Sequence, residues 1–423
     1  MDTDEYRWKM RDKFNFRFFF LFLGSTSVFC WIMNIYFVYR AVANTSVEDL
    51  YPIFRPLSGI FLWLDIHIYH TGYDPALHVA LPIDNHFGVI YYFTLFFLSV
   101  IAAVIWSVLD KGRIDYGRFS YWFNVYLRYT LAITILGYGI DKMIPVQMPY
   151  PRTVDMVRLF GNQSKEDLLW KFIGISPAYS FFTGGCEMLA AILLFSRRTA
   201  VFGYLFVLGV LTNVVALNWF YNISVKLYSS LLWVYAFYLL APWLKNIFRF
   251  FFSAKPATLP IRHFTFFKKR KRYSLQAVMI LLPLLFFLAI SMDDISKYRN
   301  EVASARREKM YKVTTFTVSD TVPAADSIRW RRVLFVYDNL MLIYNMNDLQ
   351  DWYRCDVDSP NKTLTLHALY KPDVMTLRYT YPSDGELRLS GKWKAAKDID
   401  VLLKLSPADS MYLNKERIKI IRD

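Results

Sequence analysis

The chain has 423 residues, of which 55% are hydrophobic and 18% aromatic, an apolar share well above that of ordinary soluble domains. The net charge of +15 would suit nucleic acid, yet the basic residues gather in short blocks beside apolar runs, at 7–13 and 268–272, as cytoplasmic loops of membrane proteins do. Cys30, Cys186 and Cys355 form no CxxC pair, which argues against a disulfide framework or a dithiol centre. Composition therefore favours an integral membrane protein and argues against a nucleic-acid-binding protein.

Seven segments carry close to the roughly 20 mostly apolar residues that a membrane-spanning helix needs. In chain order they are 16–39, 87–109, 121–143, 172–195, 199–220, 226–244 and 275–291. The first is too long for a signal-peptide core and lacks a small-residue cleavage site, so we expect it to be retained. An eighth stretch, 53–69, is interrupted by Arg55, Pro56 and Asp65, and we expect it to be re-entrant or interfacial.

The basic loops predict the orientation of these helices. If the N-terminus is cytoplasmic and 53–69 does not cross, the basic loops at 110–118, 197–198 and 245–272 all lie on the cytoplasmic side. If 53–69 did cross, the same loops would lie outside. We therefore predict seven membrane crossings, with the 40–86 loop and the C-terminus on the outer side, which is the periplasm beyond the inner membrane if the cell is a two-membrane bacterium.

The sequence changes character after Met292. Residues 293–309 are polar and compatible with a helical stalk, and short runs of alternating β-branched and aromatic residues follow, separated by turns such as Pro360-Asn361. About eight strands in this length predict a small antiparallel sandwich or barrel. The predicted fold is a polytopic α-helical bundle followed by an all-β domain, divided into 1–120, 121–244, 245–292 and 293–423.

Two ionisable residues lie deep in predicted spanning helices, where charges are costly and are functional candidates. Arg128 is seven residues into its helix from the cytoplasmic side, and Glu187 is about eight residues from the cytoplasmic end of the next. Because their depths match, the two side chains could pair. The pair would be either an ion pair that holds two helices together or a site that handles protons or substrate, and the third alternative is that Arg128 extends to the interface without a partner.

A polar cluster is expected at the outer helix ends. Asn218, Asn222 and Lys226 would share one helical face if the helix continued through them, and Asp141 and Lys142 end an earlier helix at similar depth. These residues either line an outward-facing polar pocket or cap helices and extend to the interface.

The loop at 40–86 is rich in histidine and carboxylate. His67, His70, His78 and His86, together with Asp65, suit a transition metal by residue type. Their spacing matches no zinc or iron signature, so the alternatives are a polar interfacial surface or a proton relay.

Residues 121–244 resemble the DoxX-like family of bacterial membrane proteins. The resemblance covers the four central helices and depends on a succession of residues: Arg128-Tyr129, Gly139, Lys142, Gln147, Trp170, Tyr179, Gly184, Glu187, Arg197-Arg198, Asn213, Asn218 and Lys226. It implies a four-helix membrane core and an association with membrane redox complexes. It supplies no catalytic set, and the loop histidines are not part of it.

Three functions follow as hypotheses. The first is a redox-associated membrane protein that interacts with a quinone or a partner oxidoreductase, with Glu187 or the Lys142 and Lys226 cluster handling protons. The side chains themselves carry no electrons, so a bound quinone or a second subunit is required. The second is a non-enzymatic platform whose β domain binds a partner or a lipid-like ligand. A transporter is disfavoured because paired half-length helices are missing from the sequence. Whether the chain is an enzyme is left open.

Overall fold

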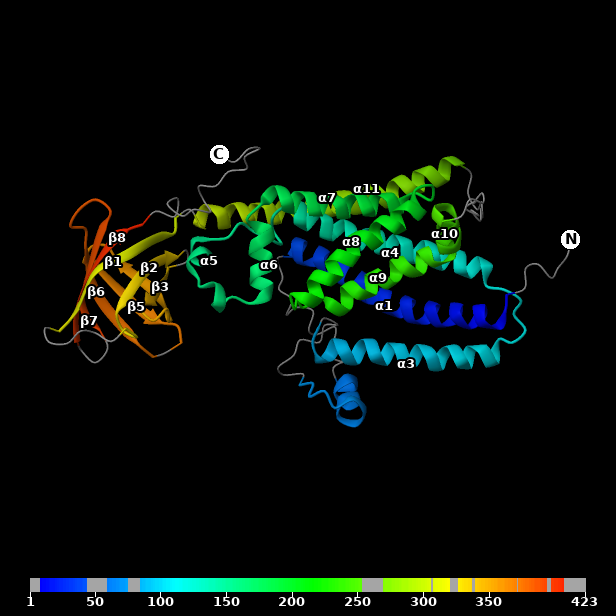
Figure 1. The fold of residues 1–423 in the computed structure, drawn as a ribbon, viewed down its shortest axis with the longest axis horizontal. Helices are drawn as coiled ribbons and strands as arrows, with labels where there is room; N and C mark the ends of the chain where they lie inside the picture. The colour runs from blue at the N-terminus through cyan, green and yellow to red at the C-terminus, as the bar shows by residue number, and fades with distance from the viewer. Residues whose placement is uncertain are drawn as a thin grey trace. The chain divides into compact units, whose positions relative to one another are not determined.

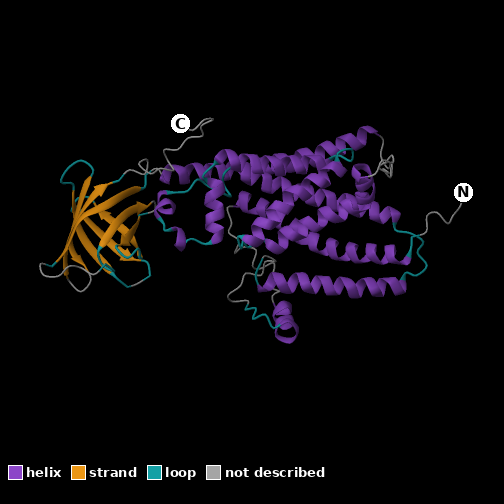
Figure 2. Cartoon of the chain, viewed as in Figure 1, coloured by secondary structure: helices purple, strands orange, loops and turns teal. Residues whose placement is uncertain are grey.

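A computed structural model describes residues 8–43, 59–74, 84–252, 269–305, 307–319, 326–336, 339–370, 372–393 and 397–406. The chain divides into two compact units. One comprises Met1–Pro149 and Lys165–Ile295, and the other Tyr150–Ser164 and Ser296–Asp423. The first is helical, and the second contains the described strands (Figure 2).

Helices build the first unit, and the last of them continues into the second (Figure 1). They are α1 (Met10–Ala43), α3 (His86–Leu109), α4 (Gly117–Met143), α6 (Lys165–Gly174), α7 (Pro177–Phe195), α8 (Ala200–Phe220), α9 (Lys226–Leu240), α10 (Leu244–Phe252) and α11 (Lys269–Ala305). The local sequence determines where α3 and α7 begin. The Asn85 side chain accepts a hydrogen bond from the Gly88 amide at 2.7 Å. Ser176 and Pro177 begin α7, where a proline loses no helical hydrogen bond.

Five described stretches are long and apolar enough to cross a membrane: Met10–Ile32, His86–Leu109, Pro177–Phe195, Ala200–Phe220 and Lys226–Phe252. They confirm the predicted polytopic helical bundle. The other two predicted spans, 121–143 and 275–291, are helical as parts of α4 and α11. Helix α4 is more polar because much of it, including Arg128, is buried against neighbouring helices rather than facing lipid.

The stretch at 53–69 is described from Gly59, where a short apolar helix runs to Tyr69. Eleven residues are about half the length that a crossing requires. Phe61 packs in a small buried cluster with Phe87, while Ile60, Trp63 and Ile66 are more than half exposed. The described part therefore agrees with a segment that does not span.

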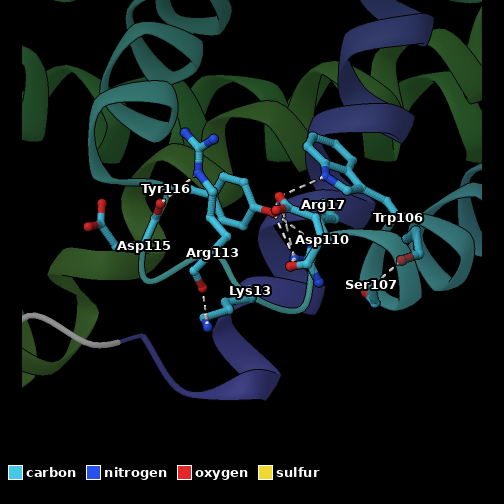
Figure 3. A network of polar contacts seen from close by, with 9 residues as sticks. Lys13, Arg17, Trp106, Ser107, Asp110, Arg113, Asp115 and Tyr116 are labelled. Atoms are coloured by element: carbon cyan, nitrogen blue, oxygen red, sulfur yellow. Dashed lines mark hydrogen bonds and ion pairs between the residues drawn. The ribbon is translucent and has the colours of Figure 1, made fainter.

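A buried arginine ties α1 to the turn between α3 and α4 (Figure 3). Arg17 is 3% exposed and donates hydrogen bonds to the Asp110 carbonyl at 2.8 Å and to the Tyr116 hydroxyl at 2.7 and 2.9 Å. The Tyr116 hydroxyl donates in turn to the Asp110 carboxylate at 2.5 Å, and this bond lowers the pKa of Asp110. Lys13 donates to the Arg113 carbonyl from the same helix end. The network fixes the first helix against the next two.

Replacing Arg17 by methionine should lower the free energy of unfolding by about 1.5–3 kcal/mol, the value of a hydrogen bond to a charged group. The Arg11→Met variant is the matched control, because the Arg11 side chain is 80% exposed and should change stability little. Thermal unfolding of the detergent-solubilised chain, followed by fluorescence-detected size exclusion, measures the difference. Equal loss in both variants would contradict the structural role given to Arg17.

Eight strands form a closed antiparallel barrel. They are β1 (Lys309–Val318), β2 (Trp330–Val336), β3 (Leu340–Asn345), β4 (Gln350–Asp358), β5 (Thr363–Ala368), β6 (Val374–Thr380), β7 (Glu386–Trp393) and β8 (Lys397–Leu405). Each pairs with the next, and β8 pairs with β1. Of the two predicted β architectures the barrel is confirmed. Alternate residues such as Val333, Leu366 and Val401, each 0% exposed, fill its interior.

A connection from the helical part of the sequence folds with the barrel. This barrel-bound segment, Tyr150–Ser164, contains the short helix α5 (Thr153–Val157). Val154 and Val157 pack against a cluster on the other face of the strands, formed by Met310, Leu334, Leu342 and Tyr344. Residues next to these in the strands face the interior, so the contact covers the outside of the barrel.

Candidate functional site

The candidate site centres on an ion pair between α4 and α7. Lys142 Nζ donates to Glu187 Oε1 at 2.5 Å, and the two side chains are 11% and 5% exposed. The helices approach closely here because Gly139 and Gly184 face each other. A Cβ atom on Gly184 would lie 2.5 Å from the Gly139 carbonyl oxygen. Small residues that let two backbones touch are typical of membrane helix pairs.

The predicted pair of Arg128 with Glu187 does not form, and that prediction is wrong. Tyr129, next to Arg128, packs against Phe195 at the end of α7, whereas Glu187 lies eight residues before that end, about 12 Å deeper. The error arose because α4 begins at Gly117 and extends well beyond the end of α7. Equal counts from predicted helix ends therefore did not mean equal depth.

Arg128 has different surroundings. It is 6% exposed, lies over the Tyr129 ring at 5.3 Å and hydrogen-bonds to Tyr204. Its Nε atom is buried with no hydrogen-bond partner among the described residues. The structure thus separates the two predicted deep charges and joins Glu187 to Lys142, which had been predicted as part of the outer polar pocket.

A cavity of about 260 Å³ opens beside the ion pair, between α4, α6, α7, α8 and α9. Its walls are mainly apolar and aromatic, with contributions from Tyr138, Trp170, Tyr179 and Tyr228. Its polar groups include Lys142, Glu187, Gln147, Glu166, Asn213 and Asn218. An apolar cavity with a few convergent polar groups is the usual form of a small-molecule site.

Two acceptors on the cavity wall are unsatisfied within the described part of the chain. Glu187 Oε2 and Gln147 Oε1 are buried and have no hydrogen-bond partner there. Lys142 has three ammonium protons, of which one is directed at Glu187. Because buried polar atoms are nearly always hydrogen-bonded, the pattern favours a ligand that donates to these oxygens. A lysine next to them can donate to the same ligand.

The predicted polar pocket is only partly formed. Asn218 is buried and lines the cavity with Lys142. Asn222 is exposed in the turn after α8 with φ of 59°, so the helix does not continue and the predicted shared face is broken. Asp141 is half-buried beside Lys142 but is not among the cavity-lining residues.

Lys226 does not line the cavity beside Lys142 and Glu187. Its ammonium lies 3.3 Å from Asp84, whose carboxylate also accepts the backbone amides of Lys226 and Leu227 at 2.5 and 2.9 Å. Asp84, from a distant part of the sequence, therefore caps the N-terminus of α9. A negative charge is stabilising at a helix N-terminus. Lys226 and His86 line a separate depression beside this cap.

The predicted metal ligands are not brought together in the residues that the structure describes, where no three His, Cys, Asp or Glu side chains converge. Asp65 accepts the amides of Thr71 and Tyr73 at 2.6 and 2.8 Å, which stabilises a turn. His67 stacks on Trp63. His70 is the C-cap residue of the turn in a left-handed conformation, and His78 lies outside the described residues.

The sequence pattern does not predict the cavity wall formed by the connection after α4. Gln147 and Trp170 enter only through the family resemblance, and no motif marks Glu166. The available signal was the short run 165–174, in which Leu169 and Ile173 recur at helical spacing between charged residues. That spacing predicts an amphipathic helix but not the helices that it covers.

These features define the class: a multi-pass helical membrane protein that has an apolar cavity with a few polar groups and a closed β-barrel domain. No family model matches the chain, and no solved structure matches it. A relative from Bacillus subtilis (strain 168), described as "Uncharacterized protein YwoB", is 34% identical over 122 residues, which cover 27% of this chain and 71% of the relative. The chain belongs to the same family as YwoB.

Proposed function

We propose that the cavity binds the head group of a quinone or quinol and that the chain is the membrane component of a redox system. The observation that carries the proposal is the pair of unsatisfied acceptors, Glu187 Oε2 and Gln147 Oε1, beside the Lys142 ammonium in an aromatic cavity. Quinol hydroxyls would donate to the acceptors, and a quinone carbonyl would accept from Lys142.

The size of the cavity favours a ring-sized ligand. Its 260 Å³ lies just below the roughly 300–1,000 Å³ typical of drug-sized ligands, so a single head group fills it and an isoprenoid tail must extend into lipid. The ring would stack on Trp170 or Tyr179. Electrons would have to come from a partner protein, since these side chains carry none. The DoxX-like resemblance of residues 121–244 supports the same direction.

The inner membrane of a bacterium is the proposed location, with the N-terminus in the cytoplasm and the barrel in the periplasm. Two features support this topology. The basic loops fall on one side, as described above. The barrel-bound segment Tyr150–Ser164 directly follows α4, so the chain must leave α4 and return from α11 on the same side. An even number of crossings then separates them, which α7, α8, α9 and α11 supply.

Quinone binding is tested with the purified full chain in lipid nanodiscs, titrated with decylubiquinone or menadione while tryptophan fluorescence is recorded. Saturable binding is expected. Trp170→Leu should weaken it by roughly 2- to 10-fold, because aromatic stacking contributes about 0.5–1.5 kcal/mol. Phe172→Leu is the control, since Phe172 lies on the same helix, 68% exposed and outside the cavity lining. Binding that does not saturate, or equal effects of both variants, would sink the proposal.

A platform that binds a partner through its barrel is the second proposal. The filled interior favours a partner on the outer surface over a lipid-like ligand inside. A protein that co-purifies in stoichiometric amount without any quinone in the organic extract would favour this alternative.

A further inference from the structure

The barrel-bound segment joins two walls of the cavity. Just before it, Gln147 and Met148 line the cavity, and just after it so do Glu166, Leu169 and Trp170 of α6. Tyr150–Ser164 itself folds with the barrel. The chain therefore leaves the cavity, packs on the β domain and returns to the cavity within some 20 residues.

The two walls form one packed layer. Met148, Leu169, Ile173 and Ile223 make a buried cluster, joined by Trp170. The backbones touch at the end of α6, where a Cβ on Gly174 would clash with the carbonyl oxygen of Pro149. We call this layer, residues 147–149 and 165–174, the cavity roof. Its two parts are in direct contact with each other and with Ile223.

The contact between the segment and the barrel is apolar and partly buried. Val154 and Val157 pack on the cluster that contains Leu334 and Leu342, both 0% exposed. Glu308, just before β1, is 9% exposed and faces Arg152, Thr153 and Asp155, and burial raises its pKa. The segment is thus fixed to the barrel by apolar packing and is not a free loop.

We propose that the β-barrel controls access to the membrane cavity by holding the segment that carries its roof. A partner that binds the barrel and displaces α5 would release the roof, and a closed roof would keep the cavity shut. The inference rests on the proposed function for the identity of the ligand, but the coupling itself concerns entry of any small molecule.

The test measures entry with a reagent rather than with a quinone, so its failure and that of quinone binding are distinguishable. Ser229, which is 5% exposed and lines the cavity, is replaced by cysteine as a reporter. The full chain in nanodiscs is treated with N-ethylmaleimide, and labelling at position 229 is followed by peptide mass spectrometry. Site-resolved detection keeps the three native cysteines from interfering.

The Val154→Asp/Val157→Asp variant should release the segment and raise the labelling rate by about tenfold or more, because burying even one valine is worth such a factor in an equilibrium. The matched control is Leu159→Asp/Phe160→Asp, two exposed apolar residues of the same segment, which should leave the rate unchanged. An equal rise in the control would overturn the proposal.

A second arm avoids substitutions in the packed contact. A protease recognition site is inserted at Gly161, which is exposed and has open space around it. Cutting separates α6 from the part of the segment that the barrel holds. Labelling of the cut protein should accelerate relative to the same uncut protein. If neither release by substitution nor cutting changes the rate, the barrel does not control the cavity.

Discussion

Replacing Lys142 with methionine should destabilise the helical unit by about 3–5 kcal/mol, the cost of leaving one charge of a buried pair without its partner. Glu187 would then be a buried carboxylate whose other oxygen already has no hydrogen-bond partner in the described residues. Thermal unfolding and the folded yield in detergent measure the loss. The Lys142→Met/Glu187→Gln double variant should recover much of it, because both charges are removed together.

The matched control for this pair is Lys226→Met. Lys226 also forms an ion pair, a part-buried one, but Asp84 retains two backbone amide donors when the ammonium is removed. The loss there should be clearly smaller. If the double variant is as unstable as Lys142→Met, the two charges are not coupled. If Glu187→Gln keeps its stability but loses quinone binding, Glu187 serves the ligand rather than the fold.

Changing Gly184 to alanine should cost about 1–3 kcal/mol, the usual penalty of overpacking a tight contact. The added Cβ would lie 2.5 Å from the Gly139 carbonyl oxygen and 2.7 Å from the Met143 amide nitrogen. Both are backbone atoms, so relief requires α4 and α7 to separate. Separation would also stretch the 2.5 Å contact between Lys142 and Glu187, which lies within one turn of this crossing.

Gly185 provides the control on the same helix. A Cβ added there meets nothing within 4 Å, so Gly185→Ala should be neutral or stabilise the helix by up to about 1 kcal/mol. The melting temperatures of the two variants in one detergent decide the matter. Similar values would mean that the helices do not meet at Gly184.

Hydropathy was sufficient to predict the long apolar helices, because residues that face lipid must be apolar whatever their neighbours are. The alternation of apolar residues between turns was sufficient to predict the β domain. The pairing of charged side chains could not be predicted, because it depends on how deep residues of two different helices lie relative to each other. Glu187 is a deep charge, as predicted, but Lys142 rather than Arg128 lies at the same depth. The reason is that the first turns of α4 extend beyond the end of α7, so that Arg128 lies near that end. Only tertiary structure gives that offset.

Connections were the other weak point. The expected shared face of Asn218, Asn222 and Lys226 depended on an unbroken helix, and the left-handed backbone at Asn222 ends it. Gln147 and Trp170 reach the cavity because the chain folds back after α4. The sequence pattern does not show which helices the chain contacts when it folds back after α4. These wall residues could therefore be found only in the structure.

The packing of α5 on the barrel has a consequence for biosynthesis. Val157 emerges from the ribosome roughly 250 residues before Leu405, the end of the strand that closes the barrel. At about 5–20 residues per second, the apolar side of α5 waits on the order of 10–50 s for its binding surface. During that interval the segment is a target for chaperones and proteases on the side of the membrane where it emerges, and barrel mutations that slow closure would extend its exposure.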